Sequence, residues 1–188
     1  MFTNNKKVLA VFQIKPKFLF LVALVGLLTG CSVINAQKGN PLSSGRWIIL
    51  PFQNYSQAPR AGEQMEELVA TLFRIRGVSD IEIYQPQDED KSGWLEFNDR
   101  RRQEKALLSA IKNNVSYAVT GSVDEWQYKL GVGSEPVVGL TVRILEVPSG
   151  KVVWSASGAR SGWSTGSLSG TAQKLVKELI SSVEIKRP

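Results

Sequence analysis

Hydrophobic and polar residues alternate in short segments over much of the chain, and this pattern predicts β-strands. Residues 46–52 form a continuous apolar run, as expected for a strand buried on both faces. Residues 138–144 alternate, and Pro148-Ser149-Gly150 joins this segment to the next β segment, which predicts a hairpin. The expected strands are 46–52, 80–85, 116–130, 137–147 and 151–159.

A second hydrophobic period, with apolar residues at i, i+3, i+4 and i+7, predicts three helices. Residues 63–76 carry one apolar stripe, and Gly77 fits the position just after the end of that helix. Asn98 can cap a helix that runs to residue 113. The last helix is expected over residues 167–185, which carry a long apolar face.

The order of these elements predicts the fold class. It is β-α-β-α-β-β-β-α, in which helices first separate single strands and a run of strands then follows. This order favours an α/β fold with a mixed five-stranded sheet packed with helices, ending in an antiparallel meander and a C-terminal helix. We expect residues 46–188 to form a single globular domain, because about 140 residues suit one hydrophobic core.

The first thirty residues differ from the rest and predict export. Several lysines precede the apolar run 18–28, which is too short to span a bilayer core of about 20 residues but suits a signal peptide. The run ends in Leu28-Thr29-Gly30-Cys31, the pattern expected where a lipoprotein signal is cleaved before a lipidated cysteine. The alternative is an uncleaved signal-anchor helix with Cys31 as an ordinary thiol.

The residues after Cys31 predict where the protein is held. Ser32 follows the cysteine, where an Asp would favour retention in the inner membrane, so we expect the periplasmic face of the outer membrane. Residues 31–45 are rich in Asn, Gly, Pro and Ser and have no periodicity. They predict a flexible tether between the lipid and the domain.

Composition excludes several function classes once residues 1–30 are set aside. The mature chain keeps 19 basic and 17 acidic residues, a net charge of +2, which does not support a nucleic-acid partner. It has no histidine and its one cysteine is Cys31. Nucleophilic triads and the usual metal ligands are therefore missing, and we expect no catalysis, no metal and no cofactor.

The remaining acidic residues offer no obvious catalytic pair. Asp124 and Glu125 are adjacent on an expected strand, which predicts that they point to opposite faces. Residues 88–90 lie in a charged segment, where a solvated loop is favoured over a glycosidase pair. Gly131-Val132-Gly133 is more typical of a hairpin turn than of a dinucleotide site.

The tryptophan residues are expected in two environments, the core and a membrane interface. Trp47 and Trp154 lie within apolar strands and are expected in the core, whereas Trp126 is expected on the same strand face as Asp124. Trp163 lies among small residues, which favours contact with a bilayer interface over folding back onto the domain.

Arg100-Arg101-Arg102 is expected in the first turns of a helix. Three successive residues spread around most of a helix, so a solvated face is favoured and a subunit contact is the better functional alternative.

Several stretches together resemble the PelC family of outer-membrane lipoproteins, which serve Pel exopolysaccharide export in biofilms. The stretches cover most of residues 46–179 and are 47–54, 61–63, 99–104, 120–129, 148–155 and 159–164.

The resemblance implies a periplasmic ring of about twelve copies that guides a cationic polysaccharide to a β-barrel porin of the PelB type. It implies that Cys31 carries the lipid anchor and that Trp163 belongs to a membrane-seating girdle. It assigns the guiding acids to Asp124, Glu125 and Glu135 and subunit contacts to Arg101 and Arg160. Gly133 stands in a turn where the family often carries an acid.

The run Leu50-Pro51-Phe52 followed by Asn54 also occurs in broader relatives, which supply an alternative function. These relatives include lipoprotein activators of cell-wall synthases and other secretion-channel lipoproteins. Such an activator needs a long tether to cross the periplasm, and residues 32–45 are few, which favours a domain held close to the membrane.

Overall fold

A mixed sheet of seven strands organises the described part of the chain, residues 32–85, 99–130 and 133–186 of a computed structural model. Its strands run in the order β1-β7-β6-β5-β2-β4, with β3 beside β5. They are β1 (Ser32–Ala36), β2 (Trp47–Ile49), β3 (Gln53–Asn54), β4 (Ile81–Ile83), β5 (Tyr117–Leu130), β6 (Ser134–Glu146) and β7 (Val152–Ser161). The mixed α/β fold, its antiparallel meander and its C-terminal helix are confirmed.

The apolar run predicted as a strand buried on both faces is the short strand β2. It pairs in parallel with both β4 and β5, and its three residues are at most 3 % exposed. Trp47 and Ile49 enter the larger core, while Ile48 faces the smaller one. A continuous apolar run is required here because both faces of the strand are covered.

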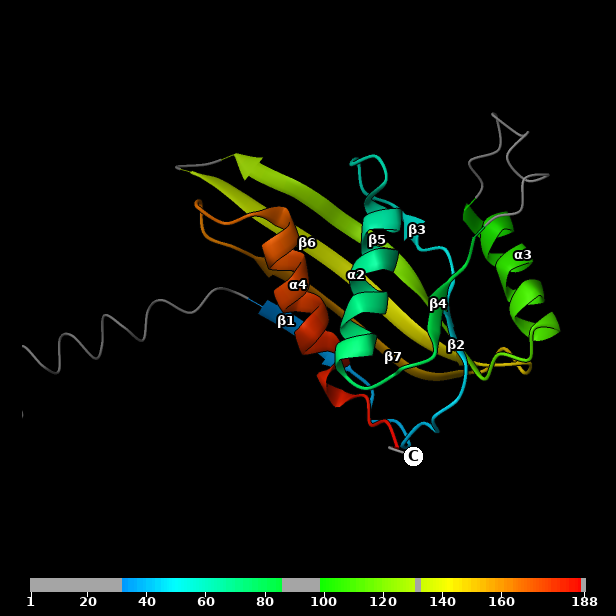
Figure 1. The fold of residues 1–188 in the computed structure, drawn as a ribbon. Helices are drawn as coiled ribbons and strands as arrows, with labels where there is room; N and C mark the ends of the chain where they lie inside the picture. The colour runs from blue at the N-terminus through cyan, green and yellow to red at the C-terminus, as the bar shows by residue number, and fades with distance from the viewer. Residues whose placement is uncertain (1–31, 86–98, 131–132, 187–188) are drawn as a thin grey trace, which may run out of the picture. The chain divides into compact units, whose positions relative to one another are not determined.

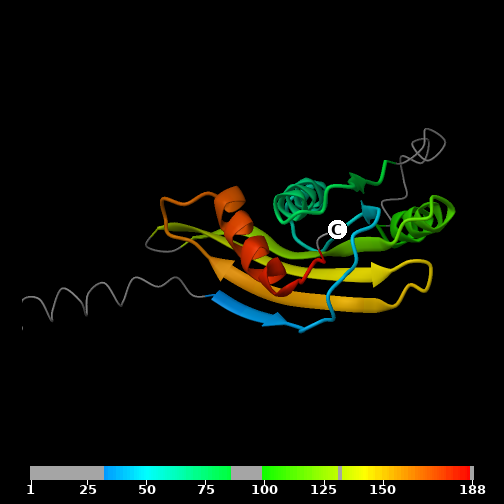
Figure 2. The same ribbon diagram turned by 60° about the horizontal axis from the view of Figure 1, so that its bottom comes forward.

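Helices cover the two faces of the sheet unequally. α2 (Ala61–Ile75) and α4 (Leu168–Leu179) pack on the same face and enclose the larger core (Figures 1 and 2). α3 (Asp99–Lys112) packs on Ile48, Leu50 and Ala118 and covers only one end of the opposite face. Away from α3, that opposite face of β5, β6, β7 and β1 carries no described helix, and we call it the open face.

The turn after α2 follows the prediction from Gly77. Gly77 has φ 101°, and its N–H donates to Arg74 O. The next N–H, that of Val78, donates to Phe73 O. This pair of bonds is a Schellman motif, which needs a residue of positive φ and therefore favours glycine.

The predicted tether is wrong for most of its length, and the five expected strands were too few. β1 pairs antiparallel with β7 from Ser32↔Arg160 to Ala36↔Ala156. Leu42 is buried and forms a parallel bridge with Ile185, which closes the N-terminal segment onto the end of the chain. The Asn, Gly, Pro and Ser residues of the whole segment 32–45 predicted a loop, whereas the edge of β7 supplies hydrogen-bond partners for its first five residues.

The last helix is shorter than predicted. α4 ends at Leu179, a single 3-10 turn η2 (Ile180–Ser182) follows, and the chain is then extended. The apolar residues beyond the helix continue the predicted stripe only in sequence: Val183 is buried, and Ile185 bridges Leu42.

Several predictions lie outside the described residues. They concern the signal segment 1–30, Cys31, the charged segment around residues 88–90, the cap at Asn98 and the turn at Gly131-Val132. Among residues whose structure is described, no helix is both long enough and apolar enough to cross a membrane.

Candidate functional site

A β-bulge in β5 shapes the acidic part of the open face. Val123 pairs with Leu140 and Glu125 pairs with Gly139, so Asp124 is an extra residue with no partner of its own in β6. Two consecutive residues therefore oppose one, which shifts the alternation of side chains by one position beyond the bulge. Val123 and Trp126 both enter the larger core as a result.

The bulge brings Asp124 and Glu125 to the same face, so the prediction that they point to opposite faces is wrong. A Cβ atom placed on Gly139 would lie 3.2 Å from Cβ of Glu125 and 3.8 Å from Cβ of Asp124. Both side chains therefore leave the backbone beside the same glycine. The prediction that Trp126 shares the face of Asp124 is wrong for the same reason, since Trp126 lies under α2 and α4 and is 8 % exposed.

Hydroxyl groups of neighbouring strands position the Asp124 carboxylate. Its Oδ1 accepts a hydrogen bond of 2.8 Å from Ser122 Oγ, and its Oδ2 accepts one of 3.2 Å from Thr141 Oγ1. The Thr141 hydroxyl also lies 3.2 Å from Ser157 Oγ of β7. A hydrogen-bonded row of polar groups thus crosses the open face from β5 to β7, and Asp124 is exposed at its end.

Glu125 is held by two side chains of its own strand. Gln127 Nε2 donates to Glu125 Oε1 at 2.9 Å, and Lys129 Nζ lies 3.0 Å from the same oxygen. The hydrogen bond from Gln127, and then that from Lys129 with its positive charge, hold the pKa of Glu125 below its ordinary value against a smaller opposing effect of burial. The carboxylate therefore stays ionised at lower pH than an ordinary glutamate.

Glu135 joins the two acids on the open face. It pairs directly with Lys129 across the β5–β6 hairpin, and opposed residues of paired strands share a face. Lys129 itself shares the face of Glu125, with which it forms the ion pair. Glu135 is exposed, four residues along β6 from Gly139. The three acids proposed from sequence thus lie on one face, which is mixed in charge since Lys129 lies among them.

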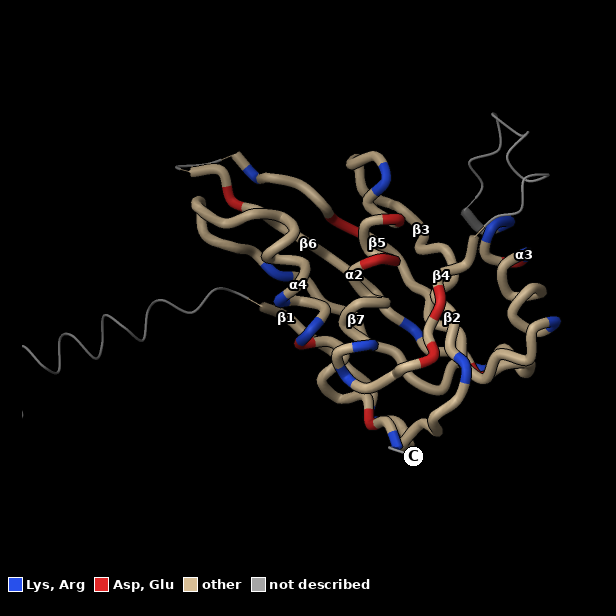
Figure 3. The backbone as a smooth tube through the Cα atoms, viewed as in Figure 1, with Lys and Arg blue, Asp and Glu red and all other residues tan. Residues whose placement is uncertain are grey.

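Charges of both signs are spread over the described chain (Figure 3). Arg143 also lies on the open face, opposite Thr120 in β5, and is exposed. The acids are therefore a local concentration and not one half of a strongly divided molecule.

Trp163 is exposed, in contrast to the two tryptophans predicted in the core. Trp47 and Trp154 are each 1 % exposed, which confirms that prediction, whereas Trp163 is 59 % exposed. It lies in the loop between β7 and α4, which does not fold it back into the domain. Its exposure agrees with a role at an interface.

The two arginines expected in subunit contacts occupy different surroundings. Arg101 is exposed on α3. Arg160 Nη1 forms an ion pair of 2.7 Å with Glu178 of α4, and the same carboxylate accepts a hydrogen bond of 3.3 Å from Ser32 Oγ. Arg160 thus joins β7, α4 and β1 within one chain, and a contact between copies stays a prediction for both residues.

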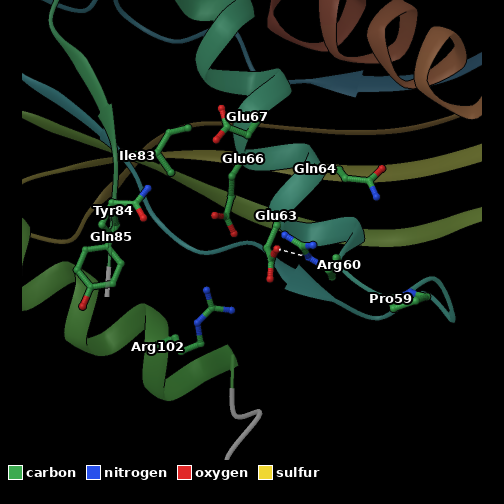
Figure 4. Close-up of a pocket in the computed structure, with 10 residues that line it drawn as sticks. All are labelled: Pro59, Arg60, Glu63, Gln64, Glu66, Glu67, Ile83, Tyr84, Gln85 and Arg102. Carbon is green, nitrogen blue, oxygen red and sulfur yellow. Dashed lines mark hydrogen bonds and ion pairs between the residues drawn. The ribbon is translucent and has the colours of Figure 1, made fainter. Parts of the chain in front are cut away.

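A cleft of about 600 Å³ beside the start of α2 was not foreseen from the sequence (Figure 4). Three glutamates and two arginines line it, and Arg60 Nε pairs with Glu63 Oε2 at 2.7 Å. Glu66 is 7 % exposed and accepts a hydrogen bond of 3.0 Å from the Phe52 N–H. Glu66 stands three and seven residues before the buried Val69 and Phe73. Its position on the apolar stripe of the helix was therefore the feature of the sequence that could have predicted its burial.

This cleft does not have the features of a catalytic site. Glu66 is engaged in holding the backbone after β2, and acids and bases nearly balance. Within the described ranges no group of three or more His, Cys, Asp or Glu residues could hold a metal ion.

Comparisons with known proteins identify the family. No protein-family model matches the chain, and no curated protein matches it. Among solved structures, the PelC dodecamer from Paraburkholderia phytofirmans is 32 % identical and has a TM-score of 0.70 in each of two crystal forms. The match covers 83 % of this chain and 100 % of PelC in one form, and 84 % and 100 % in the other.

A more distant neighbour supports the fold alone. The lipoprotein GNA1162 from Neisseria meningitidis is 16 % identical, with a TM-score of 0.52 over 75 % of this chain and 96 % of its own. The full-length match to PelC, at 32 % identity, carries the assignment. The chain belongs to the PelC family.

Proposed function

We propose that this protein is an outer-membrane lipoprotein of a Pel-type exopolysaccharide export complex, and that it works by binding and assembly without catalysis. Cys31 carries the lipid anchor on the periplasmic face of the membrane. About twelve copies form a ring, and the ring guides a cationic polysaccharide to a β-barrel porin of the PelB type. Membership of the PelC family and the dodecameric state of the solved PelC support the proposal.

The observation that carries the guiding role is the bulge that puts Asp124 and Glu125 side by side on the open face. Their Cβ atoms stand over the one position, Gly139, that has no side chain to cover them. Two adjacent carboxylates on a surface of small residues can meet a cationic sugar without a steric barrier. Both acids can face the polymer, which a regular strand would not allow.

The small positive charge of the mature chain does not oppose this role, because the potential near a surface depends on local charges. A ring repeats each acid once per copy, so two or three carboxylates per chain become a band of negative charge around an opening. Nearby Lys129 moderates that band. A moderate attraction suits a guide, since a tightly held polymer would stop moving.

The assembly is tested by measuring the native mass of the mature lipidated protein in detergent. A closed ring built from identical heterologous contacts should give a single species of about twelve copies. A monomer at high concentration, or a two-fold dimer, contradicts the ring.

The guiding role is tested by charge reversal. Asp124→Lys and Glu125→Lys should lower the amount of secreted polymer while the ring persists in native mass measurements. Glu146→Lys is the matched control, since Glu146 is an exposed acid at the other end of β6. If reversal at Asp124, Glu125 and Glu135 leaves both the ring and secretion unchanged, the acidic guide is wrong for this protein.

A further inference from the structure

Three large side chains are exposed at one end of the sheet. Leu130 is 92 % exposed at the end of β5, Tyr128 is 44 % exposed two residues before it, and Trp163 is 59 % exposed after β7. Burial of such side chains stabilises folded proteins, so a cluster left in water indicates a surface that is covered in use. We call Tyr128, Leu130 and Trp163 the apolar tip.

Contacts between two loops hold the apolar tip together. Gly133, at the start of the return strand, packs against the β7–α4 loop so closely that a Cβ placed on it would lie 2.7 Å from Ser164 Cβ. The Gly162 N–H donates to Pro136 O at 2.8 Å, and the Leu168 N–H donates to the Tyr128 hydroxyl at 3.3 Å. The end of the hairpin and the loop that carries Trp163 therefore present one surface.

The chain enters the fold close to this surface. Ser32, the residue after Cys31, pairs with Arg160, which pairs in turn with Val138. Beyond Val138 the hairpin continues four more residues, to the pair Leu130↔Ser134. At about 3.4 Å per residue, the hairpin extends roughly 14 Å beyond the level of Ser32. Amphipathic elements that lie in a membrane interface are buried to about 5–10 Å, so a hairpin end of this reach is long enough to enter the interface.

The chemistry of the tip also fits a lipid surface. Between Arg160 and Lys174 the sequence has no charged residue. Tyr and Trp combine an apolar ring with a polar group, which favours the boundary between lipid and water, and Leu favours the hydrocarbon beyond it.

We infer that Leu130 is a second point of contact with the phospholipid bilayer, so that the hairpin end and Trp163 enter the membrane interface together beside the lipid on Cys31. This inference rests on the proposed lipid anchor. It also fixes an orientation: β5 runs toward the membrane and ends there at Leu130, so the acids at Asp124 and Glu125 lie about 17–20 Å beneath Leu130 along the strand, in the aqueous periplasm.

The test measures the depth of position 130 in a bilayer. The full mature chain, lipidated at Cys31, carries Leu130→Cys as its one free thiol, to which a nitroxide spin label is attached. The protein is reconstituted in vesicles of phosphatidylethanolamine and phosphatidylglycerol. Collision of the label with oxygen, which concentrates in the lipid, is compared with collision with a water-soluble nickel complex. Ser149→Cys, at an exposed turn at the other end of the sheet, is the control.

We expect the ratio of oxygen to nickel collisions at position 130 to be several-fold higher than at position 149. The same label on a Cys31→Ser chain, measured in solution without detergent or vesicles, should give the ratio of the control position. If the protein floats with the vesicles while position 130 meets the nickel complex as freely as position 149, the inference is wrong and the lipid anchor stands. A label shielded from both reagents places Leu130 between subunits and also overturns the inference. A lipidated chain that does not float overturns the anchor and the inference with it.

Discussion

Asp124 and Glu125 are consecutive residues of one strand, yet both side chains stand on the same face of the sheet over Gly139. The bulge that produces this pair keeps Val123 and Trp126 in the core on either side of it. Bulges often re-aim side chains beside functional sites. Here the bulge brings a second carboxylate to the open face without removing an apolar residue from the core.

The pKa of Glu125 should respond to Gln127. Gln127→Ala removes the largest cause that lowers this pKa, so the value should rise toward that of an ordinary glutamate. A carboxyl group whose pKa is lowered in the folded state stabilises the protein at pH values above its pKa in the unfolded state. This contribution is lost as the pH falls through the pKa of the folded state. Loss of the charge should therefore begin at higher pH in the variant, which an NMR titration of the carboxyl carbon measures. Lys129→Met should move the pKa in the same direction, and an unchanged value in both variants contradicts the assigned causes.

Gly121 should tolerate no side chain. A Cβ at this position would lie 2.0 Å from Thr141 O and 2.6 Å from Cε1 of Phe52, and the first of these atoms is backbone. Gly121→Ala should lower the free energy of unfolding by about 1–3 kcal/mol or prevent folding, because the sheet and Phe52 have to move apart. Urea denaturation measures the change. Ser157→Ala, at an exposed position of the same sheet, is expected to stay within about 0.5 kcal/mol of the parent protein.

Two tryptophans should differ sharply in their contribution to stability. Trp154 is 1 % exposed and its Nε1 donates to Ser182 Oγ at 3.2 Å, so Trp154→Ala should cost about 3–5 kcal/mol. Trp163→Ala should change the melting temperature little, since most of the side chain is already in water, but should weaken seating on the membrane and polymer export. If both variants lower the melting temperature equally, the exposed position of Trp163 is contradicted.

Glu66 should matter as the acceptor of the hydrogen bond from the Phe52 N–H. Glu66→Leu leaves the buried Phe52 N–H without its partner and should cost about 1–3 kcal/mol. Glu66→Gln keeps an acceptor oxygen in place and should cost less. Chemical denaturation of both variants compares them, and a larger loss for Gln than for Leu would contradict the assigned role.

Cys31 should decide where the protein resides. Cys31→Ser removes the thiol proposed to accept the lipid, so the protein should leave outer-membrane fractions and lack the added mass of the acyl chains. Fractionation and mass spectrometry of the parent and variant proteins measure both effects. A variant that still sediments with the membrane would show that another part of the chain holds it there.

The sequence by itself determined the elements whose residues face a single environment. The apolar run of β2, the stripe of α2 with Gly77 after it, and the alternation of β6 each follow from one local period, and all three appear close to the predicted positions. The core positions of Trp47 and Trp154 followed in the same way. The resemblance that identified the family also depended only on local stretches.

Tertiary structure alone decided the features that depend on a distant partner. Residues 32–36 belong to a longer segment, 32–45, whose composition is typical of a loop, and they form β1 because the edge of β7 offers unpaired backbone groups. Asp124 and Glu125 share a face because pairing with β6 leaves one residue of β5 without a partner. No pattern of residues within β5 predicts this bulge. A one-residue shift reverses every later side chain, so the open face and its acids were set by the register between strands and not by the order of residues within one.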